Sequence, residues 1–295
     1  MSKYANHDSR ITIHWVEMSH AERWKEIAAG PDEDIDLVEA ALLIAAQEYP
    51  DLDVLAYLGR MDRMATTLRG RLRRDIGPTE AIIALNRYLF EELGFSGNVR
   101  DYYNPRNSFL NDVLDRKLGI PITLAVIYSE VGRRVGLALH GVSFPGHFLV
   151  KCPARDGVVV LDPYAGGASL SLEDLQQRLR VLRGGTAPPP DIARRMLAAA
   201  GKKEILARML RNLKSIYLQR RDLPRALAAA DRVITLEPRA AEEYRDRAAI
   251  YLDLECFRAA LSDLRNYLML KPGADDVAVV QRRVVDLQHI AARLN

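Results

Sequence analysis

The most hydrophobic stretch of the chain covers residues 121–135, where apolar side chains fall on nearly every face of a potential helix. Ile122, Leu124, Val126 and Val131 leave no polar stripe, so this stretch predicts a helix that is buried on all sides. Amphipathic helical periodicity is present in residues 35–48, 52–65, 79–93 and 107–118. We therefore expect a domain in which several outer helices pack around one central helix.

The pattern changes after this central helix. Three short runs of β-favouring residues follow, separated by Pro145-Gly146 and by Asp156-Gly157, and they cover residues 138–144, 147–152 and 157–161. Runs of this length and composition predict strands, and the short turns between them favour antiparallel neighbours. Helices followed by a small antiparallel sheet define an α+β fold.

The last third of the chain repeats itself. An offset of 34 residues aligns Tyr217 with Tyr251, Ala226 with Ala260, and Pro238 with Pro272. This period is typical of tetratricopeptide repeats, in which small residues let neighbouring helices approach closely. Two unrelated amphipathic helix pairs could also align by chance, but the mixture of aligned residue types favours a repeat. The pattern predicts helices over 204–219, 224–236, 240–253 and 257–270, and a closing helix over 276–292.

A Gly- and Pro-rich break separates the two patterns at residues 184–190. Consecutive prolines remove backbone donors and favour an extended connection. We expect an N-terminal domain over 1–183, a linker over 184–191 and a repeat module over 192–295. The charge distribution agrees with two modules, because residues 192–295 carry a net charge of +7 and residues 1–191 carry −4.

Composition excludes several classes of protein. With 48% hydrophobic and 27% charged residues, the chain is neither disordered nor fibrous. No apolar run approaches the roughly 18 residues of a membrane span, and no signal peptide is evident, so we expect a cytoplasmic protein. Cys152 and Cys256 lie far apart, without C-x-x-C or paired-histidine spacing, so neither a disulfide nor a metal site is expected. No phosphate-binding loop is present, so no cofactor is expected.

Two polar residues lie on the predicted sheet. His147 opens the second strand, and Asp162 closes the third. If these strands are neighbours, the carboxylate can orient the imidazole, which is the base half of a catalytic triad. The nucleophile would then belong at the start of the buried helix, near Pro121, where the helix dipole stabilises an anion. The alternative is structural: His147 belongs to a tight turn, and Asp162 bonds the backbone of the loop that follows it.

Four motifs carry a family resemblance: NPRNSFLN at 104–111, GIPITL at 119–124, GVSFPGHFLV at 141–150 and LDPY at 161–164. With them the chain resembles the SirB-type bacterial transglutaminase-like proteins, from about residue 35 onward and including their tetratricopeptide tail. The resemblance implies a papain-like core, in which a Cys at the start of the central helix is followed by a His and an Asp on neighbouring strands. His147 and Asp162 fall on the last two positions.

The chain departs from that pattern at the first position. The nucleophile is expected near Pro121 or Ile122, and neither side chain can attack, so no acyl-enzyme would form through a thiol. Cys152 lies five residues beyond His147 on the same predicted strand, an offset that places the two on opposite faces. Thr123 and Ser108 carry hydroxyl groups, and each is a speculative nucleophile that would need a well-placed base.

Two further groups of residues are candidates for binding. Asn104, Asn107 and Asn111 could line a ligand cleft with their amides, but capping of the helix that begins near Ser108 is the favoured interpretation. The second group makes the first repeat helix basic and comprises Arg208, Arg211 and Lys214. These side chains are candidates for partner contacts. Without interleaved aromatic residues, a basic face more often marks solvent exposure, so nucleic acid is not the expected partner.

We therefore expect a protein that binds other proteins and acts as a regulator or adaptor. A transglutaminase-like domain without its Cys nucleophile is joined to repeats that bind a protein or peptide. On this hypothesis the chain is a pseudoenzyme. The alternative is a hydrolase or acyltransferase acting on an amide bond, with His147 as base, Asp162 orienting it, and Thr123, Ser108 or water attacking. Binding of nucleic acid or ribosomes through the basic helix is a third, weaker hypothesis.

Overall fold

The fold was analysed in a computed structural model that describes residues 18–154, 157–186 and 189–293. Its N-terminal part is a cluster of helices around one central helix, α7 (Pro121–Arg134), as the hydrophobic pattern predicts. The surrounding helices are α2 (His20–Ala29), α3 (Leu37–Ala46), α4 (Val54–Arg69), α5 (Pro78–Asn86) and α6 (Leu110–Arg116), and a π-helical turn over Arg87–Glu92 continues α5. Every residue of α3 is buried, so this helix forms a second layer of the core beside α7.

A four-stranded antiparallel sheet packs on α7. Its strands, in spatial order, are β3 (His140–Val142), β4 (Leu149–Ala154), β5 (Gly157–Asp162) and β6 (Ala168–Leu170). Alternate residues point to opposite faces: Val150 and Leu161 join the core around α7, whereas Leu149 and Val160 contact a separate apolar cluster. That second face is covered by α8 (Leu172–Leu182) and α9 (Pro190–Arg195). The α+β fold is thus confirmed.

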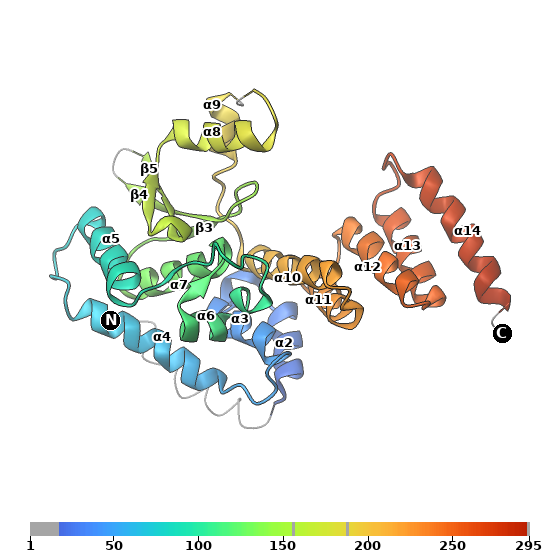
Figure 1. Ribbon diagram of the computed structural model, residues 1–295, viewed down its shortest axis with the longest axis horizontal. Helices are drawn as coiled ribbons and strands as arrows, with labels where there is room; N and C mark the ends of the chain where they lie inside the picture. The colour runs from blue at the N-terminus through green and yellow to red at the C-terminus, as the bar shows by residue number, and fades with distance from the viewer. Residues whose placement is uncertain (1–17, 155–156, 187–188, 294–295) are drawn as a thin grey trace.

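The C-terminal part is entirely helical in the described residues (Figure 1). Its helices are α10 (Lys202–Gln219), α11 (Leu223–Leu236), α12 (Ala241–Asp253), α13 (Phe257–Leu270) and α14 (Val277–Arg293). Each begins and ends within two residues of the predicted range. Ala226 and Ala260, which the 34-residue offset aligns, are both fully buried, because adjacent repeat helices come close together at these positions.

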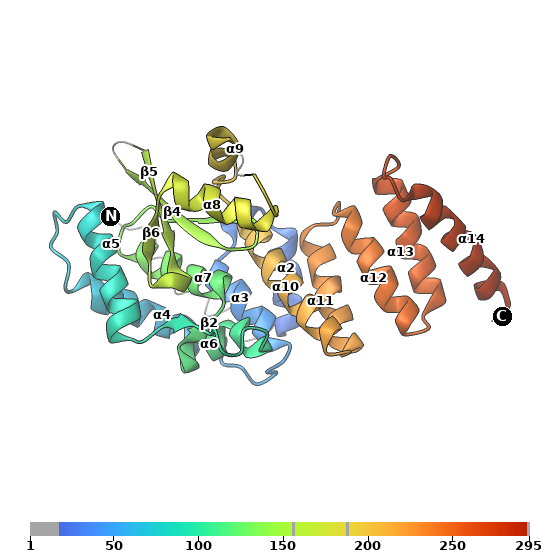
Figure 2. The same cartoon turned by 45° about the horizontal axis from the view of Figure 1, so that its top comes forward.

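The two helix pairs of the repeat have different surroundings. Apolar residues of α10 and α11 belong to the same core as α3 and α7, whereas α12, α13 and α14 form a core of their own. Two views show α12–α14 extending away from the sheet and the central helix (Figures 1 and 2). The division of the chain at residues 184–191 stays a prediction; α9 begins at Pro190, inside the expected linker.

Several short elements have no counterpart in the predicted pattern. They are α2, α8, β6 and a two-residue parallel pairing between β1 (Ser96–Gly97) and β2 (Leu118–Gly119). Helix α8 has a clear local signal, because Ser171 and Asp174 form a reciprocal capping box and leucines follow at helical spacing. This helix matters for the site, since it brings a basic side chain to Asp162.

Candidate functional site

His147 and Asp162 lie in direct contact at one end of the sheet. The imidazole Nε2 is 2.8 Å from Asp162 Oδ1. Asp162 is the last residue of β5 and is 1% exposed, while the His147 side chain retains 17% of its exposure. The carboxylate accepts a hydrogen bond from the imidazole Nε2–H, and this contact favours the tautomer that leaves Nδ1 as a potential base.

Asp162 has two further hydrogen-bond donors. Arg178, on α8, donates an Nη2–H to Asp162 Oδ2 at 2.8 Å, and the backbone N–H of Tyr164 donates to Oδ1 at 3.1 Å. Burial by itself would raise the pKa of Asp162, but the hydrogen bonds and charges of His147 and Arg178 outweigh it and hold that pKa below its usual value. The carboxylate is therefore ionised at neutral pH and can orient the imidazole.

The loop after Asp162 is fixed by a half-buried side chain from another helix. Asn86, at the end of α5, accepts a hydrogen bond from the Tyr128 hydroxyl at 2.7 Å and donates one to the Gly167 carbonyl at 3.0 Å. Gly167 has a positive φ of 77°, and a Cβ atom there would overlap the Asn86 amide, so this close approach requires glycine. In turn, Gly167 N–H donates to the Asp162 carbonyl at 2.9 Å.

The turn that carries His147 is held by a side chain of α10. Arg208, on α10, donates to the carbonyl oxygens of Phe144 at 3.1 Å and of His147 at 2.7 Å, and to Ser143 Oγ at 2.7 Å. Gly146 provides the positive φ, 67°, that this turn needs. Helix α10 therefore takes part in positioning the imidazole.

Two tyrosine rings lie in a row beside the His147 imidazole. The Tyr164 ring meets the His147 ring edge to face at 5.9 Å, and Tyr102 meets Tyr164 in the same way at 6.3 Å. Tyr164 in turn packs against Gly97, where a Cβ atom would overlap its ring. This aromatic rim offers an apolar contact surface next to the imidazole.

The start of α7, where the resemblance places a nucleophile, presents no free reactive group. Pro121 and Ile122 are buried. Thr123 is fully buried, and its hydroxyl donates to the Asn107 carbonyl at 2.8 Å while accepting from the Ile120 N–H at 3.1 Å. The hydroxyl thus caps α7, as polar side chains at helix starts commonly do. These contacts favour a structural role for Thr123.

The hydrogen bonds of the other predicted polar residues do not involve His147 or Asp162. Asn104 caps the short 3₁₀ turn at Pro105–Asn107. The predicted capping of the helix that begins near Ser108 is wrong, because α6 has Phe109 at its N-cap and no side-chain cap there. Asn107 is fully buried and donates to the carbonyls of residues 101 and 102. Ser108 and Asn111 are also buried, and each has one side-chain oxygen without a hydrogen-bond partner among the described residues.

The hydrogen-bond contacts of the two cysteines are to backbone carbonyls and do not involve His147. Cys152 is 2% exposed in β4, its sulfur lies 3.7 Å from the Pro153 carbonyl, and burial raises the pKa of its thiol. A thiol in this environment is a poor nucleophile. Cys256 is exposed at the N-cap of α13, in the second helix pair.

The basic residues of α10 all have internal partners. Arg208 binds the His147 turn, as described above. Arg211 pairs with Glu237 and Glu243, at 2.5 and 2.7 Å, and Lys214 pairs with Glu243 at 2.6 Å. A role in contacting a partner stays a prediction for these three side chains, since each is engaged within the chain.

Three residues that position the pair were absent from the sequence predictions. Arg178 could have been found through the capping box that starts α8. Tyr164 ends the LDPY motif at 161–164, but its ring contact with His147 was not predicted. Asn86 offered no sequence signal, because its importance depends on the loop that it contacts. No cluster of three or more metal-ligating side chains occurs among the residues described, and no helix there is long and apolar enough to cross a membrane.

A buried central helix, a small antiparallel sheet with a His–Asp contact, and a helical repeat together define a transglutaminase-like protein with a tetratricopeptide module. Sequence comparison agrees. The model of the Transglutaminase-like superfamily matches residues 55–211, and that of a tetratricopeptide repeat matches residues 213–284. The chain belongs to the UPF0162 family of bacterial transglutaminase-like proteins.

Several relatives are similar over most of their length. A UPF0162 protein of Xylella fastidiosa strain Temecula1 is 45% identical over 267 residues, which cover 90% of this chain and 95% of the relative. A UPF0162 protein of Pseudomonas aeruginosa is 33% identical over 85% of this chain and 90% of its own. Protein SirB1 of Salmonella typhimurium is 23% identical over 78% of this chain and 84% of its own. The predicted relationship to SirB-type proteins is thus confirmed.

Proposed function

We propose that this protein works by binding a protein or peptide, as an adaptor or regulator, and that its transglutaminase-like domain does not catalyse thiol-dependent acyl transfer. One observation carries the proposal. His147 and Asp162 keep the geometry of an oriented base, but at the start of α7 the only hydroxyl, that of Thr123, is fully buried and bonded at both sides. A base without an attacking group cannot form an acyl-enzyme.

The helical repeat supplies the binding surface. Repeat modules of stacked helix pairs present extended surfaces to peptides, and the second pair, α12 and α13, has its own apolar core outside the transglutaminase-like domain. The first pair shares the core of that domain. Binding should therefore depend on exposed residues of α12–α14 more than on α10, whose basic side chains are used internally.

Photo-crosslinking in the full-length protein tests the binding half of the proposal. A photoreactive amino acid is placed at Ala249 on α12 or Met269 on α13, both exposed, with the exposed Ile83 on α5 as matched control. One defined protein captured at the repeat positions, and not at Ile83, is the expected result. Equal capture at all three positions, or none, would remove the repeat as the binding surface. Deletion of the repeat is less informative, because α10 and α11 complete the domain core.

An activity assay tests the catalytic half. The purified protein is incubated with glutamine-containing peptides and a fluorescent amine, and both amine incorporation and peptide hydrolysis are followed. We expect no turnover above that of the His147→Ala variant. Turnover that the His147→Ala and Asp162→Asn variants both abolish would overturn the proposal in favour of a hydrolase that uses His147 as base and water as attacking group.

A further inference from the structure

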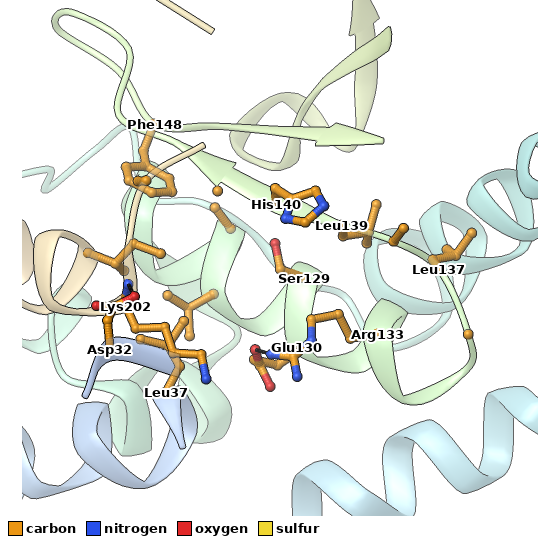
Figure 3. A pocket seen from close by; sticks show the side chains of 17 residues that line it. Asp32, Leu37, Ser129, Glu130, Arg133, Leu137, Leu139, His140, Phe148 and Lys202 are labelled. Carbon is orange, nitrogen blue, oxygen red and sulfur yellow. Dashed lines mark hydrogen bonds and ion pairs between the residues drawn. The ribbon is translucent and has the colours of Figure 1, made fainter. Parts of the chain in front are cut away.

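A cavity of about 450 Å³ lies beside the second half of α7 (Figure 3). Its walls come from α7, from the segment that leads into β3, from the start of α10 and from the chain before α3. Neither His147 nor Asp162 lines it. The volume lies within the range of small-molecule sites.

One side chain in this cavity lacks the hydrogen bond that its burial requires. Ser129 is 7% exposed, and its hydroxyl has no hydrogen-bond partner among the residues described. A buried serine inside a helix commonly returns its hydroxyl to the carbonyl four residues earlier. Here the hydroxyl instead points across the cavity toward His140 (Figure 3). Since a buried hydroxyl without a partner is unfavourable, the cavity is suited to a molecule that supplies the partner.

The charges around the cavity are already balanced. Glu130 accepts hydrogen bonds from Arg133 and Arg134 at 2.7 and 2.9 Å. Asp32 accepts the backbone N–H groups that start α10, and the Lys202 ammonium donates to two backbone carbonyls at 2.8 and 2.5 Å. The lining therefore offers no uncompensated charge to an anion or to a cation.

The remaining walls are apolar. They include Leu37, Val126, Leu139, Phe148 and Ile205, and all five are buried. An apolar ligand surface would be removed from water against these side chains, which is favourable by roughly 25 cal/mol per Å². At the mouth of the cavity lies His140, an exposed imidazole that can donate or accept a hydrogen bond.

We propose that this cavity binds a small, uncharged and mainly apolar molecule that carries one oxygen function. The Ser129 hydroxyl binds that oxygen, the apolar walls cover the rest of the molecule, and His140 closes the polar side of the entrance. This binding site is independent of the proposed adaptor function, because it uses neither the repeat surface nor the His147–Asp162 contact.

Three eight-carbon probes of different charge test the proposal on the full-length protein: 1-octanol, octanoate and octylammonium. We expect saturable binding of 1-octanol by titration calorimetry, with methyl NMR shifts at Val126, Leu139 and Ile205, and at least fivefold weaker binding of the two charged probes. Ser129→Ala should weaken 1-octanol binding about fivefold, the value of one neutral hydrogen bond. Tighter binding of octanoate or octylammonium would overturn the assignment of an uncharged ligand.

Two further variants separate the cavity from nonspecific uptake. Ala138 lines the cavity from an exposed position, so Ala138→Trp should block entry without disturbing the core and should abolish 1-octanol binding. Ser108→Ala is the matched control, since its hydroxyl is also buried and without a partner but does not line this cavity; it should bind 1-octanol like the wild type. No saturable binding, or equal binding by the Ser129→Ala and Ala138→Trp variants and the wild type, would refute the proposal.

Discussion

Replacement of Asp162 tests whether its carboxylate holds the candidate site together. Asp162→Ala removes an acceptor that is 1% exposed and serves His147, Arg178 and the Tyr164 N–H. Removal of one member of a fully buried ion pair costs about 3–5 kcal/mol. Here the side chains of His147 and Arg178 keep 17% and 34% of their exposure, so both can turn partly to water. We therefore expect Asp162→Ala to lower the free energy of unfolding by about 2–3 kcal/mol.

Asp162→Asn separates the charge from the shape of this side chain. The amide oxygen can still accept from the Tyr164 N–H, so we expect a smaller loss of about 1–2 kcal/mol. Because the folded-state pKa of Asp162 is lowered, ionisation contributes stability that is complete above the unfolded-state pKa, near 4. That contribution is lost as the pH falls through the folded-state value. The difference between wild type and Asp162→Asn should thus shrink as the pH falls below 4.

Urea unfolding between pH 7 and 3 gives these free energies, and hydrogen exchange of a peptide over β5 localises them. The local measurement is needed because α12–α14 have a separate core and can unfold in a transition of their own. If Asp162→Ala lost less than about 1 kcal/mol, or if the Asp162→Asn difference stayed unchanged down to pH 3, the carboxylate would not be the ionised centre of this site.

Three further outcomes are expected. Gly97→Ala should destabilise the protein by about 1–3 kcal/mol and displace the Tyr164 ring, because the added methyl group overlaps that ring; thermal unfolding and tyrosine NMR signals check this, and an unchanged variant would contradict the packing. Glu243→Gln should cost about 2–4 kcal/mol, since the negative charge shared by two basic side chains is lost and an amide NH2 replaces one of the two acceptor oxygens. Denaturant unfolding should show the loss, and a neutral result would deny the ion pairs a structural role. Alkylation of the native protein by iodoacetamide should label Cys256 and leave Cys152 unmodified until unfolding; mass spectrometry decides, and early labelling of Cys152 would show that its strand is accessible.

Much of the fold is encoded in local patterns. A run of residues that is apolar on every face can only be stable as a buried element, and α7 occupies that place. Short β-favouring runs and turn residues likewise predicted β3, β4 and β5, and the 34-residue period predicted the repeat helices within two residues. Each of these signals depends on neighbours a few residues apart, which the sequence displays directly.

The contact between His147 and Asp162 was predictable because His147 comes just before one strand and Asp162 ends its antiparallel neighbour. The structure places His147 in the turn before β4 rather than on the strand itself. Val150 lies opposite Leu161 at one end of the β4–β5 pairing. The chain just before β4 and the last residue of β5 therefore come close together at that end. The identification of Arg178 as a second partner was not predictable in the same way. Its helix had a local signal, but where that helix packs is set by the apolar cluster between α8 and the sheet.

The sequence by itself determined the central helix, the order of strands and repeat helices, and the two residues, His147 and Asp162, that meet at the candidate site. Only the tertiary structure decided which charges pair across elements. It turned Arg208, Arg211 and Lys214 from exposed candidates into internal contacts, and it left the Ser129 hydroxyl facing a cavity. The physical reason is the separation in sequence of the residues involved. Periodicity and turn chemistry act between near neighbours, whereas burial and hydrogen bonding depend on distant segments that the whole fold brings together.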